Sequence, residues 1–410
     1  MQASTGPAGV CDAALAAAIA AVSAAAVMPK RLPSPRGRLV VIAIGKAAVP
    51  MMTAVQAQRM VTGLVVAPHG HVPEGSGWPG VAIIAAGHPV PDADSMRAAD
   101  AALAVATSLA ADDHLLVLLS GGGSALLAAP VAGVSLGDKA ALTRALLRSG
   151  AAIAEINTVR KALSRIKGGR LAAASRAPVT TWIISDIPGD DPVLVASGPT
   201  IADGCTAAMA QAVLDRFGVV PSASVAAALR VPGDVPAPTP TGDVRIIARA
   251  RDALKAAVRV VHDAGYAVTD LGDALQGEAR MLGAEHAALA LRMAAAGGRH
   301  AIISGGETSV TVMSDSGRGG RNLEYALGLA LALGGAPGIT AIAADSDGID
   351  GSSDAAGARV GPDTLTRGGD AAAHLVRNDA HAFFAAIGDL VVTGPTLTNV
   401  NDIRIILIDS

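Results

Sequence analysis

The sequence predicts an α/β protein of two domains, in which a doubly wound parallel sheet comes first and a smaller α/β domain follows. Three observations lead to this fold class. The 410 residues are 51% apolar and 16% charged, enough for two or three packed domains and too apolar for disorder. Short β-branched runs alternate with Ala-rich helical stretches, as in doubly wound folds. A proline-rich stretch interrupts this alternation once.

The first apolar stretch, residues 12–27, is Ala-rich and is preceded by no basic residue. A secretion signal carries basic residues before its apolar run, and a bilayer span is longer and more apolar. We therefore expect a packing helix in a cytoplasmic protein. Cys11 and Cys205 are expected to be free thiols in a reducing compartment. The net charge of −3 predicts no nucleic-acid partner and no membrane partner.

Five apolar runs predict the strands of the first domain. Each run is continuously apolar, which indicates burial on both faces and hence a parallel sheet between helices. The runs are residues 39–44, 63–67, 81–85, 114–119 and 180–185.

Prolines at 232, 236, 238 and 240 make residues 231–243 unsuitable for a helix or a central strand. We therefore place a linker at 236–243, between a first domain of residues 1–235 and a second of residues 244–410. Strands of the second domain are predicted at 244–249, 300–303, 339–343, 389–392 and 403–408.

Two familiar nucleotide motifs do not apply. No G-x-x-x-x-G-K-[ST] sequence occurs, so the chain is not a P-loop protein. A G-x-G-x-x-G sequence occurs at Gly75, Gly77 and Gly80, but it precedes a predicted strand and opens no helix. A dinucleotide fold needs the opposite order, so we interpret this match as a loop.

Two glycine-rich loops follow predicted strands, where α/β proteins bind ligands. Absent Cβ atoms let a backbone approach a phosphate, although a tight turn without a ligand is the alternative. The first loop comprises Ser120, Gly121, Gly122, Gly123 and Ser124, and the second contains Gly305, Gly306 and Glu307.

Cations stand at helix starts, where the helix dipole disfavours them unless an anion binds. Lys46 follows the first strand, and Arg321 opens a strongly apolar helix. We expect both side chains outside the core, with phosphate or carboxylate ligands, although solvated loops are the alternative. Arg160 and Lys167 lie seven residues apart, on one face of a predicted helix, and could line the same anion site.

Acidic residues also follow strands, at Asp186, Asp190 and Asp191 and again between Asp345 and Asp354. Such carboxylates suit Mg²⁺ beside phosphate oxygens. Turn residues and helix N-caps are the alternative for each single aspartate.

These motifs together resemble the type II glycerate 2-kinase family, whose members are often catalogued as hydroxypyruvate reductases. The resemblance runs from about residue 10 to the end of the chain. Its motifs are GKAA, HPVPDADS, SGGGSALL, INTVRKALSRIKGGRLA, SDIPGDDPVLVASGPT, GGRNLEYAL, DSDGIDGSSDAAGA and TGPTLTNVND. Ala162 departs from the family pattern, which often has His there, and Leu397 stands where the family often has Gly.

The resemblance implies transfer of a phosphoryl group from ATP to D-glycerate, giving 2-phosphoglycerate, in a cleft between a Rossmann-like N-terminal domain and a smaller C-terminal one. It implies that Lys46 and Arg321 are the active-site cations. We expect the two glycine-rich loops, Arg160 and Lys167 to bind the nucleotide. Asp186 is then a candidate base, and Asp190 and Asp191 are candidate Mg²⁺ ligands.

Two other functions stay open at this stage. An NAD(P)H-dependent hydroxypyruvate reductase would need a dinucleotide site in proper context, and a non-catalytic sensor of phosphorylated metabolites would need no carboxylate cluster. Association of copies into a homo-oligomer is likewise left open.

Overall fold

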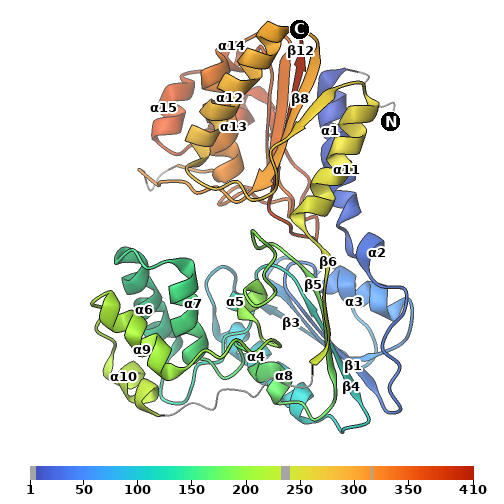
Figure 1. The fold of residues 1–410 in the computed structure, drawn as a ribbon, viewed down its shortest axis with the longest axis vertical. Coiled ribbons are helices and arrows are strands. Elements are labelled where there is room, and N and C mark those ends of the chain that lie inside the picture. Colours follow the sequence, from blue (N-terminus) through green and yellow to red (C-terminus); the bar gives the residue numbers. More distant parts are fainter. Residues whose placement is uncertain (1–5, 232–240, 315–316) are drawn as a thin grey trace. The chain divides into compact units, whose positions relative to one another are not determined.

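The computed structural model describes residues 6–231, 241–314 and 317–410 (Figure 1). The chain divides into two compact units. We call residues 28–185 and 191–247 the parallel-sheet unit. Residues up to Val27, residues 186–190 and residues 248–410 form the mixed-sheet unit.

This division differs from the predicted boundary at 236–243. Residues up to Val27 and residues 186–190 belong to the mixed-sheet unit rather than to the first domain. Residues 236–240 of the predicted linker lie outside the described residues, and the remainder begins strand β6, Thr241–Ala248. Because β6 is hydrogen-bonded to the first sheet, the chain leaves that sheet only after Ile247.

The parallel-sheet unit is built on a sheet of six strands in the order β3-β2-β1-β4-β5-β6. The first five are β1 Leu39–Ile44, β2 Thr62–Pro68, β3 Val81–Ala86, β4 His114–Leu119 and β5 Val179–Ile184. The pairings of β1 with β2 and β4, of β2 with β3 and of β4 with β5 are all parallel. Every residue of β1 and β5 is buried, which confirms the prediction of a doubly wound parallel sheet. The order is that of Rossmann folds, in which ligands bind where the strand order reverses.

Helices cover both faces of this sheet. Helices α3 (Ala48–Gln56) and α4 (Ala93–Thr107) lie on opposite sides of it in Figure 1. Short elements follow at α5 (Gly123–Leu126), α8 (Arg170–Ala173) and the 3₁₀ turn Val195–Ser197.

Four further helices group beside the sheet as a helical lobe with its own apolar core (Figure 1). They are α6 Leu136–Arg148, α7 Ile153–Ala162, α9 Ala207–Arg216 and α10 Ala223–Arg230. Leu142 and Leu146 of α6 pack with Ile156 and Val159 of α7 and with Leu214 of α9. The lobe therefore holds α6 and α7 in a fixed relation beside the sheet.

The mixed-sheet unit contains strands in the order β11-β10-β9-β12-β8-β7. They are β7 Ala267–Asp270, β8 Arg299–Gly306, β9 Ile339–Asp345, β10 Gly357–Val360, β11 Leu390–Val391 and β12 Asp402–Asp409. Strands β7 and β8 run parallel, whereas β12 is antiparallel to both β8 and β9. Strands β7 and β10 were not predicted, because neither is a continuous apolar run.

Helices also cover both faces of the mixed sheet. On one face, α1 (Pro7–Ala21) packs on β9 and β12, and its neighbour α11 (Ala250–Asp263) packs on β7 and β8. On the other face, α12 (Ala279–Ala296) packs with α13 (Arg321–Leu333). The unit is completed by α2 Ala24–Val27, α14 Thr364–Arg367, α15 Ala371–Val376 and α16 Ala380–Ile387. The predicted packing helix at 12–27 is thus α1 and α2.

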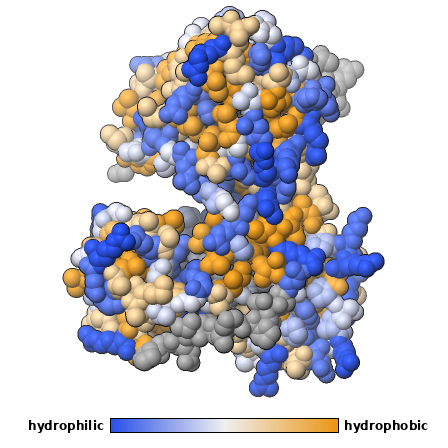
Figure 2. Space-filling view, in the orientation of Figure 1, coloured by the Kyte–Doolittle hydropathy of each residue, from blue (hydrophilic) through white to orange (hydrophobic). Residues whose placement is uncertain are grey.

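In the described part of the chain, no helix has the length and apolar character that crossing a bilayer requires. On the face that Figure 2 shows, hydrophobic and hydrophilic residues are interspersed over both units. Such a mixture is ordinary for a globular surface.

Candidate active site

The loops after β1 and β4 meet at the point where the strand order of the parallel sheet reverses. The amide nitrogen of Lys46 donates to the carbonyl oxygen of Gly121 at 3.0 Å. The amide nitrogen of Ala47 donates to Ser120 Oγ, also at 3.0 Å. A Cβ on Gly45 would lie 2.3 Å from Ser120 Oγ, so only glycine allows this approach. The structure thus brings Lys46 and the loop of residues 120–124 together at the ligand-binding edge of the sheet.

The glycines of this loop are also required by the packing of the protein itself. Gly122 has φ +84°, and a Cβ there would lie 2.9 Å from the ring of His88. A Cβ on Gly123 would lie 2.8 Å from the Cβ of Ala196. The glycine run therefore has a structural reason that sequence reasoning did not supply, alongside its predicted role in phosphate binding.

Two cations converge on Ser124 at the start of α5. Arg160 Nη2 donates to Ser124 Oγ at 2.9 Å, and Lys167 Nζ donates to Ser124 Oγ at 3.1 Å and to its carbonyl oxygen at 2.6 Å. These donors fill both lone pairs of the hydroxyl, so Ser124 donates its proton to Ser197 Oγ at 2.8 Å. Ser197 is held there with a left-handed backbone, φ +62°.

Arg160 and Lys167 both bond to Ser124, but they do not share a helix as the prediction assumed. Helix α7 ends at Ala162, and Lys167 lies in the following turn. Ala162, where the family often has His, packs against the core of the helical lobe.

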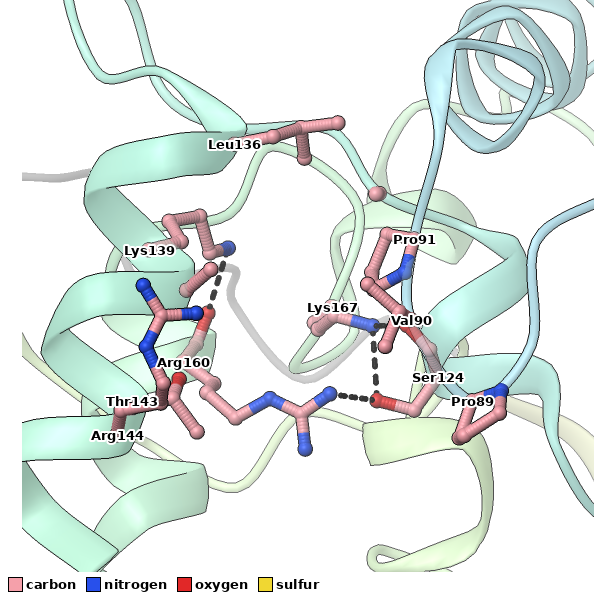
Figure 3. A pocket seen from close by; sticks show the side chains of 12 residues that line it. Pro89, Val90, Pro91, Ser124, Leu136, Lys139, Thr143, Arg144, Arg160 and Lys167 are labelled. Carbon is pink, nitrogen blue, oxygen red and sulfur yellow. Dashed lines mark hydrogen bonds between the residues drawn. The ribbon is translucent and has the colours of Figure 1, made fainter. Parts of the chain in front are cut away.

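A pocket of about 290 Å³ opens beside Ser124 (Figure 3). It is lined by Pro89, Val90, Pro91, Ser124, Ala128, Leu136, Lys139, Ala140, Thr143, Arg144, Arg160 and Lys167. Burial, with the charges of Arg160, Lys139 and Lys161 nearby, holds the pKa of Lys167 well below its usual value. Burial and the charges of Arg160 and Arg170 lower the pKa of Lys139 to about 7. Burial also lowers the pKa of Arg160.

Arg321 lies in the mixed-sheet unit, where β8, β9 and β12 meet at one edge of the sheet. In the register of the strands, Asp402 is opposite both Gly306 and Asp345. Arg321 Nε donates to Asp402 Oδ1 at 2.7 Å, and Nη2 donates to Asp345 Oδ2 at 2.6 Å. Burial alone would lower the pKa of Arg321, but Asp402 and Asp345 raise it above the ordinary value. The guanidinium is therefore permanently charged and fixed in position.

The helix that Arg321 opens is capped by a buried carboxylate. Asp350 accepts from the amide nitrogens of Asn322 at 3.1 Å and Leu323 at 2.8 Å. Burial and the charge of Asp402 raise the pKa of Asp350 to about 6, against the effect of these hydrogen bonds and of Arg321. Carboxylates of the protein itself thus compensate the cation at this helix start, and the side chain of Arg321 is only 23% exposed. Arg321 was expected outside the core, and its partly exposed side chain is held by these carboxylates.

The second glycine-rich loop lies at the same edge. Gly305 and Gly306 end β8, and the carbonyl oxygen of Gly305 accepts from the buried Arg404 at 3.3 Å. Glu307 is exposed, and its charge also raises the pKa of Arg321. The structure therefore brings Gly306 and Glu307 near Arg321, as neighbours in one cluster.

The three predicted aspartates lie in different surroundings. Asp186 is held by a loop of the mixed-sheet unit: Asn399 donates to its carboxylate at 3.3 Å, and Asn401 donates to its carbonyl oxygen. Asp190 lies 3.9 Å from Arg249 in a left-handed conformation. Asp191 is exposed and accepts from the amide nitrogen of Val193 at 3.0 Å. Both Asp190 and Asp191 keep carboxylate oxygens suited to Mg²⁺.

Among the described residues, one group of three side chains has ligand atoms close enough to share a metal ion: His69, Asp92 and Asp94. Asp92 caps α4 through a capping box with Ser95, and His69 lies 2.8 Å from it. These contacts account for the group as a helix cap.

Several residues of these clusters were not predicted: Lys139, Ser197, Asp402 and Asn399. Asp402 and Asn399 lie in the sequence Asn-Val-Asn-Asp between buried residues. Such a group of polar residues could have indicated a functional site. No sequence signal marks Lys139, because a single lysine on an amphipathic helix is usually a solvated residue.

Leu397 has φ +58°, a left-handed backbone conformation that favours glycine. The departure from the family pattern at this position therefore places a strained residue in the loop that precedes β12.

Two family models match the chain. The first, described as Domain of unknown function (DUF4147), matches residues 10–230, and the second, the MOFRL family, matches residues 300–402. A D-glycerate 2-kinase of Thermotoga maritima is 38% identical, over 90% of this chain and 91% of that protein. A "Putative hydroxypyruvate reductase" of Agrobacterium vitis is 48% identical, over 97% of this chain and 92% of that protein.

Solved structures agree with this relationship. The crystal structure of a glycerate kinase from Thermotoga maritima superposes with a TM-score of 0.85 at 36% identity, covering 96% of this chain and 97% of that one. A Pyrococcus horikoshii protein gives a TM-score of 0.77 at 32% identity, with 97% of each chain covered. The chain therefore belongs to the type II glycerate kinase family.

Proposed function

We propose that this protein is a glycerate 2-kinase, which transfers a phosphoryl group from ATP to the 2-hydroxyl of D-glycerate. The observation that carries this function is the pair of loops at the switch point of the parallel sheet. There a lysine and a Ser-Gly-Gly-Gly-Ser loop stand where a dinucleotide fold has its glycine-rich turn. Some relatives are named glycerate 2-kinases and others hydroxypyruvate reductases. The residues of the site are therefore needed to distinguish the two activities.

A reductase would need a different switch point. In dinucleotide folds a G-x-G-x-x-G turn follows β1, and an acidic residue after β2 binds the ribose. Here Gly45-Lys46-Ala47-Ala48 follows β1, and Pro68-His69-Gly70-His71 ends and follows β2. The Gly75–Gly80 match leads into β3 instead. These features favour phosphoryl transfer over hydride transfer.

In phosphoryl transfer a protein mainly positions the reactants and stabilises charge on the moving group. We assign this stabilisation to Lys46 and Arg321. Within the described residues, Nε and Nη2 of Arg321 donate to carboxylates, and this orients the guanidinium. Nη1 then remains as the donor toward a bound ligand. The backbone of residues 121–124, with Arg160 and Lys167, is assigned to nucleotide phosphates, and Gly305, Gly306 and Glu307 to the remaining nucleotide contacts.

Asp186 is assigned as the base for the 2-hydroxyl, oriented by Asn399. Mg²⁺, held by Asp190 and Asp191, would neutralise charge on the nucleotide phosphates. The buried free thiols of Cys11 and Cys205 support a reducing, cytoplasmic location.

Mass spectrometry of the products tests this function directly. D-Glycerate with ATP and Mg²⁺ should give 2-phosphoglycerate and ADP, and excess chelator should abolish this turnover until Mg²⁺ is restored. Hydroxypyruvate with NADH is the parallel reaction. Conversion of hydroxypyruvate without ADP formation, at a comparable rate, would establish the reductase instead.

A further inference from the structure

Within the ranges that the structure describes, the pocket beside Ser124 is lined by positive charges without negative ones, and the fold does not require this excess of cations. Four cations line it: Lys139, Arg144, Arg160 and Lys167. Among the described residues that line it, none is a carboxylate. Burying cations without a counter-charge destabilises the folded state, and the low pKa values of Lys139 and Lys167 reflect that cost.

The neighbouring Lys161 shows how this chain buries a lysine for structure alone. Lys161 is 3% exposed, like Lys167, but its Nζ lies 2.6 Å from Asp203 Oδ2. In contrast, Lys167 donates to the hydroxyl and the carbonyl oxygen of Ser124, which are neutral acceptors. The two lysines share an environment and differ in whether the protein supplies the anion.

Part of the cluster has a structural explanation. Lys139 Nζ donates to the carbonyl oxygens of Arg160 at 3.2 Å and Leu163 at 3.0 Å, at the carboxyl end of α7. This is a favourable place for a cation. An ammonium has a third proton, however. Figure 3 shows Arg160 and Lys167 extending toward Ser124, and Lys139 of α6 lines the same pocket. Capping of α7 therefore leaves the convergence of the cations unexplained.

The rest of the lining indicates what kind of anion fits. Pro89, Val90, Pro91 and Leu136 make part of the lining apolar. In Figure 3 the loop of residues 89–91 lies across the pocket from Lys139 and Arg144. A phosphoryl group carries nearly two negative charges and accepts several charge-assisted hydrogen bonds. The apolar part of the lining then accommodates the uncharged part of the same molecule.

We propose that this pocket binds a phosphoryl group, and that Lys139 and Arg144 contribute to that binding together with Arg160 and Lys167. The inference rests on the proposed kinase function, which supplies two sources of this group: the nucleotide and the phosphorylated product. Bound phosphate restores the missing counter-charge, so Lys139 takes up a proton when the ligand binds. Arg160, Arg170 and Lys167 are the charged groups that surround Lys139 and oppose this protonation in the empty pocket.

Titration calorimetry on the full chain tests the proposal without turnover. ADP, 2-phosphoglycerate, inorganic phosphate and D-glycerate are titrated separately, near pH 7.5, in two buffers with different enthalpies of ionisation. Lys139→Met and Arg144→Met are compared with Lys255→Met, which removes an exposed lysine on α11.

We expect Lys139→Met to weaken ADP or 2-phosphoglycerate about ten- to a hundredfold, as loss of a charge-assisted hydrogen bond does. Arg144→Met should weaken the same ligand less, and Lys255→Met should not. Loss of affinity for ADP alone identifies the nucleotide as the source, and loss for 2-phosphoglycerate alone identifies the product. On binding, the wild-type protein should take up as much as about one proton more than Lys139→Met does. The comparison with the variant is needed because the phosphate group also titrates, equally in both proteins.

Equal affinities and equal proton uptake in wild type and both pocket variants would overturn the proposal. So would a loss confined to D-glycerate, which has a carboxylate and no phosphoryl group. If Lys139→Met does not fold, the affinities of Arg144→Met for the same ligands still decide. A failed kinase assay, with these binding results intact, would reject the proposed function and leave the phosphoryl pocket standing.

Discussion

The two predicted cation sites follow opposite electrostatic designs. In the mixed-sheet unit, Arg321 is paired with two buried carboxylates of the chain, Asp345 and Asp402. In the parallel-sheet unit, Arg160 and Lys167 bond to the neutral Ser124. The difference teaches that cations predicted to bind an anion can form either a saturated cluster, whose counter-charges the protein supplies, or an unsaturated cluster, which has none. Only the unsaturated cluster, that of Arg160 and Lys167, depends on a bound anion for its counter-charge.

Arg321→Ala should have the largest effect, because it breaks the saturated cluster. Turnover should fall about 10³-fold or more, as for a lost transition-state arginine. The free energy of unfolding should also fall by about 3–5 kcal/mol, since the carboxylates of Asp345 and Asp402 lose a buried partner. Product mass spectrometry and denaturant unfolding measure the two effects.

Arg318→Ala is the matched control, because Arg318 is half-exposed and pairs with the exposed Asp354. Its effect on stability should stay below about 1 kcal/mol. Ordinary turnover in Arg321→Ala would remove that residue from the mechanism.

Lys167→Met should behave in the opposite way. It removes a buried cation that has no carboxylate partner, so the stability of the ligand-free protein should be unchanged or higher. In contrast, kcat/KM should fall about ten- to a hundredfold, because a charge-assisted bond to phosphate is lost. A large destabilisation with unchanged kcat/KM would make Lys167 a structural residue, and the comparison between the clusters would fail.

The pH dependence of the free energy of unfolding tests whether the unsaturated cluster buries the charge of Lys139. Its pKa is about 7 in the folded protein and 10.5 ordinarily, so between these values the unfolded chain binds more protons. The free energy of unfolding should therefore rise as pH increases from about 7 to 8.5, and this rise should be smaller in Lys139→Met. Urea unfolding at several pH values measures it, and identical slopes in the two proteins would contradict the burial of this charge.

The smallest effect is expected from relieving backbone strain. Leu397 and Ser197 both have left-handed backbones, but Ser197 makes a hydrogen bond to Ser124 and is buried. Leu397→Gly should stabilise the protein by about 0.5–1 kcal/mol, the strain relieved less the entropy of glycine. Ser197→Gly, which loses the hydrogen bond as well, should not stabilise. Thermal unfolding of both variants tests this, and equal shifts would show that strain alone governs both sites.

Much of the parallel-sheet unit follows from the sequence, because continuous apolar runs and glycine turns are local signals. Lys46 and Ser120–Ser124 follow from the same signals, since parallel strands end at one edge of a sheet. Strand direction is not local, and this is why Asp402 was missed. It begins a strand, and it meets the end of β9 only because β12 runs antiparallel.

The convergence of Arg160 and Lys167 was predicted from a continuous helix, which the structure interrupts at Ala162. The turn that follows α7 aims Lys167 at Ser124, and no helical periodicity contains that turn. Lys139 could not be predicted either, because its burial depends on how the helical lobe packs beside the loop at 89–91.

The position of β12 has a consequence for biosynthesis. Residues 402–409 lie between β8 and β9 in the mixed sheet, and α1 packs on β9 and β12. The parallel-sheet unit is encoded by residues 28–247 apart from a short excursion, so it can fold while the ribosome is still translating. The mixed sheet has to wait for β12, which is translated after the other strands of the sheet, and α1 waits with it. Throughout elongation, the apolar edges of β8 and β9 therefore depend on chaperones, or on rapid completion of the chain, for protection from aggregation.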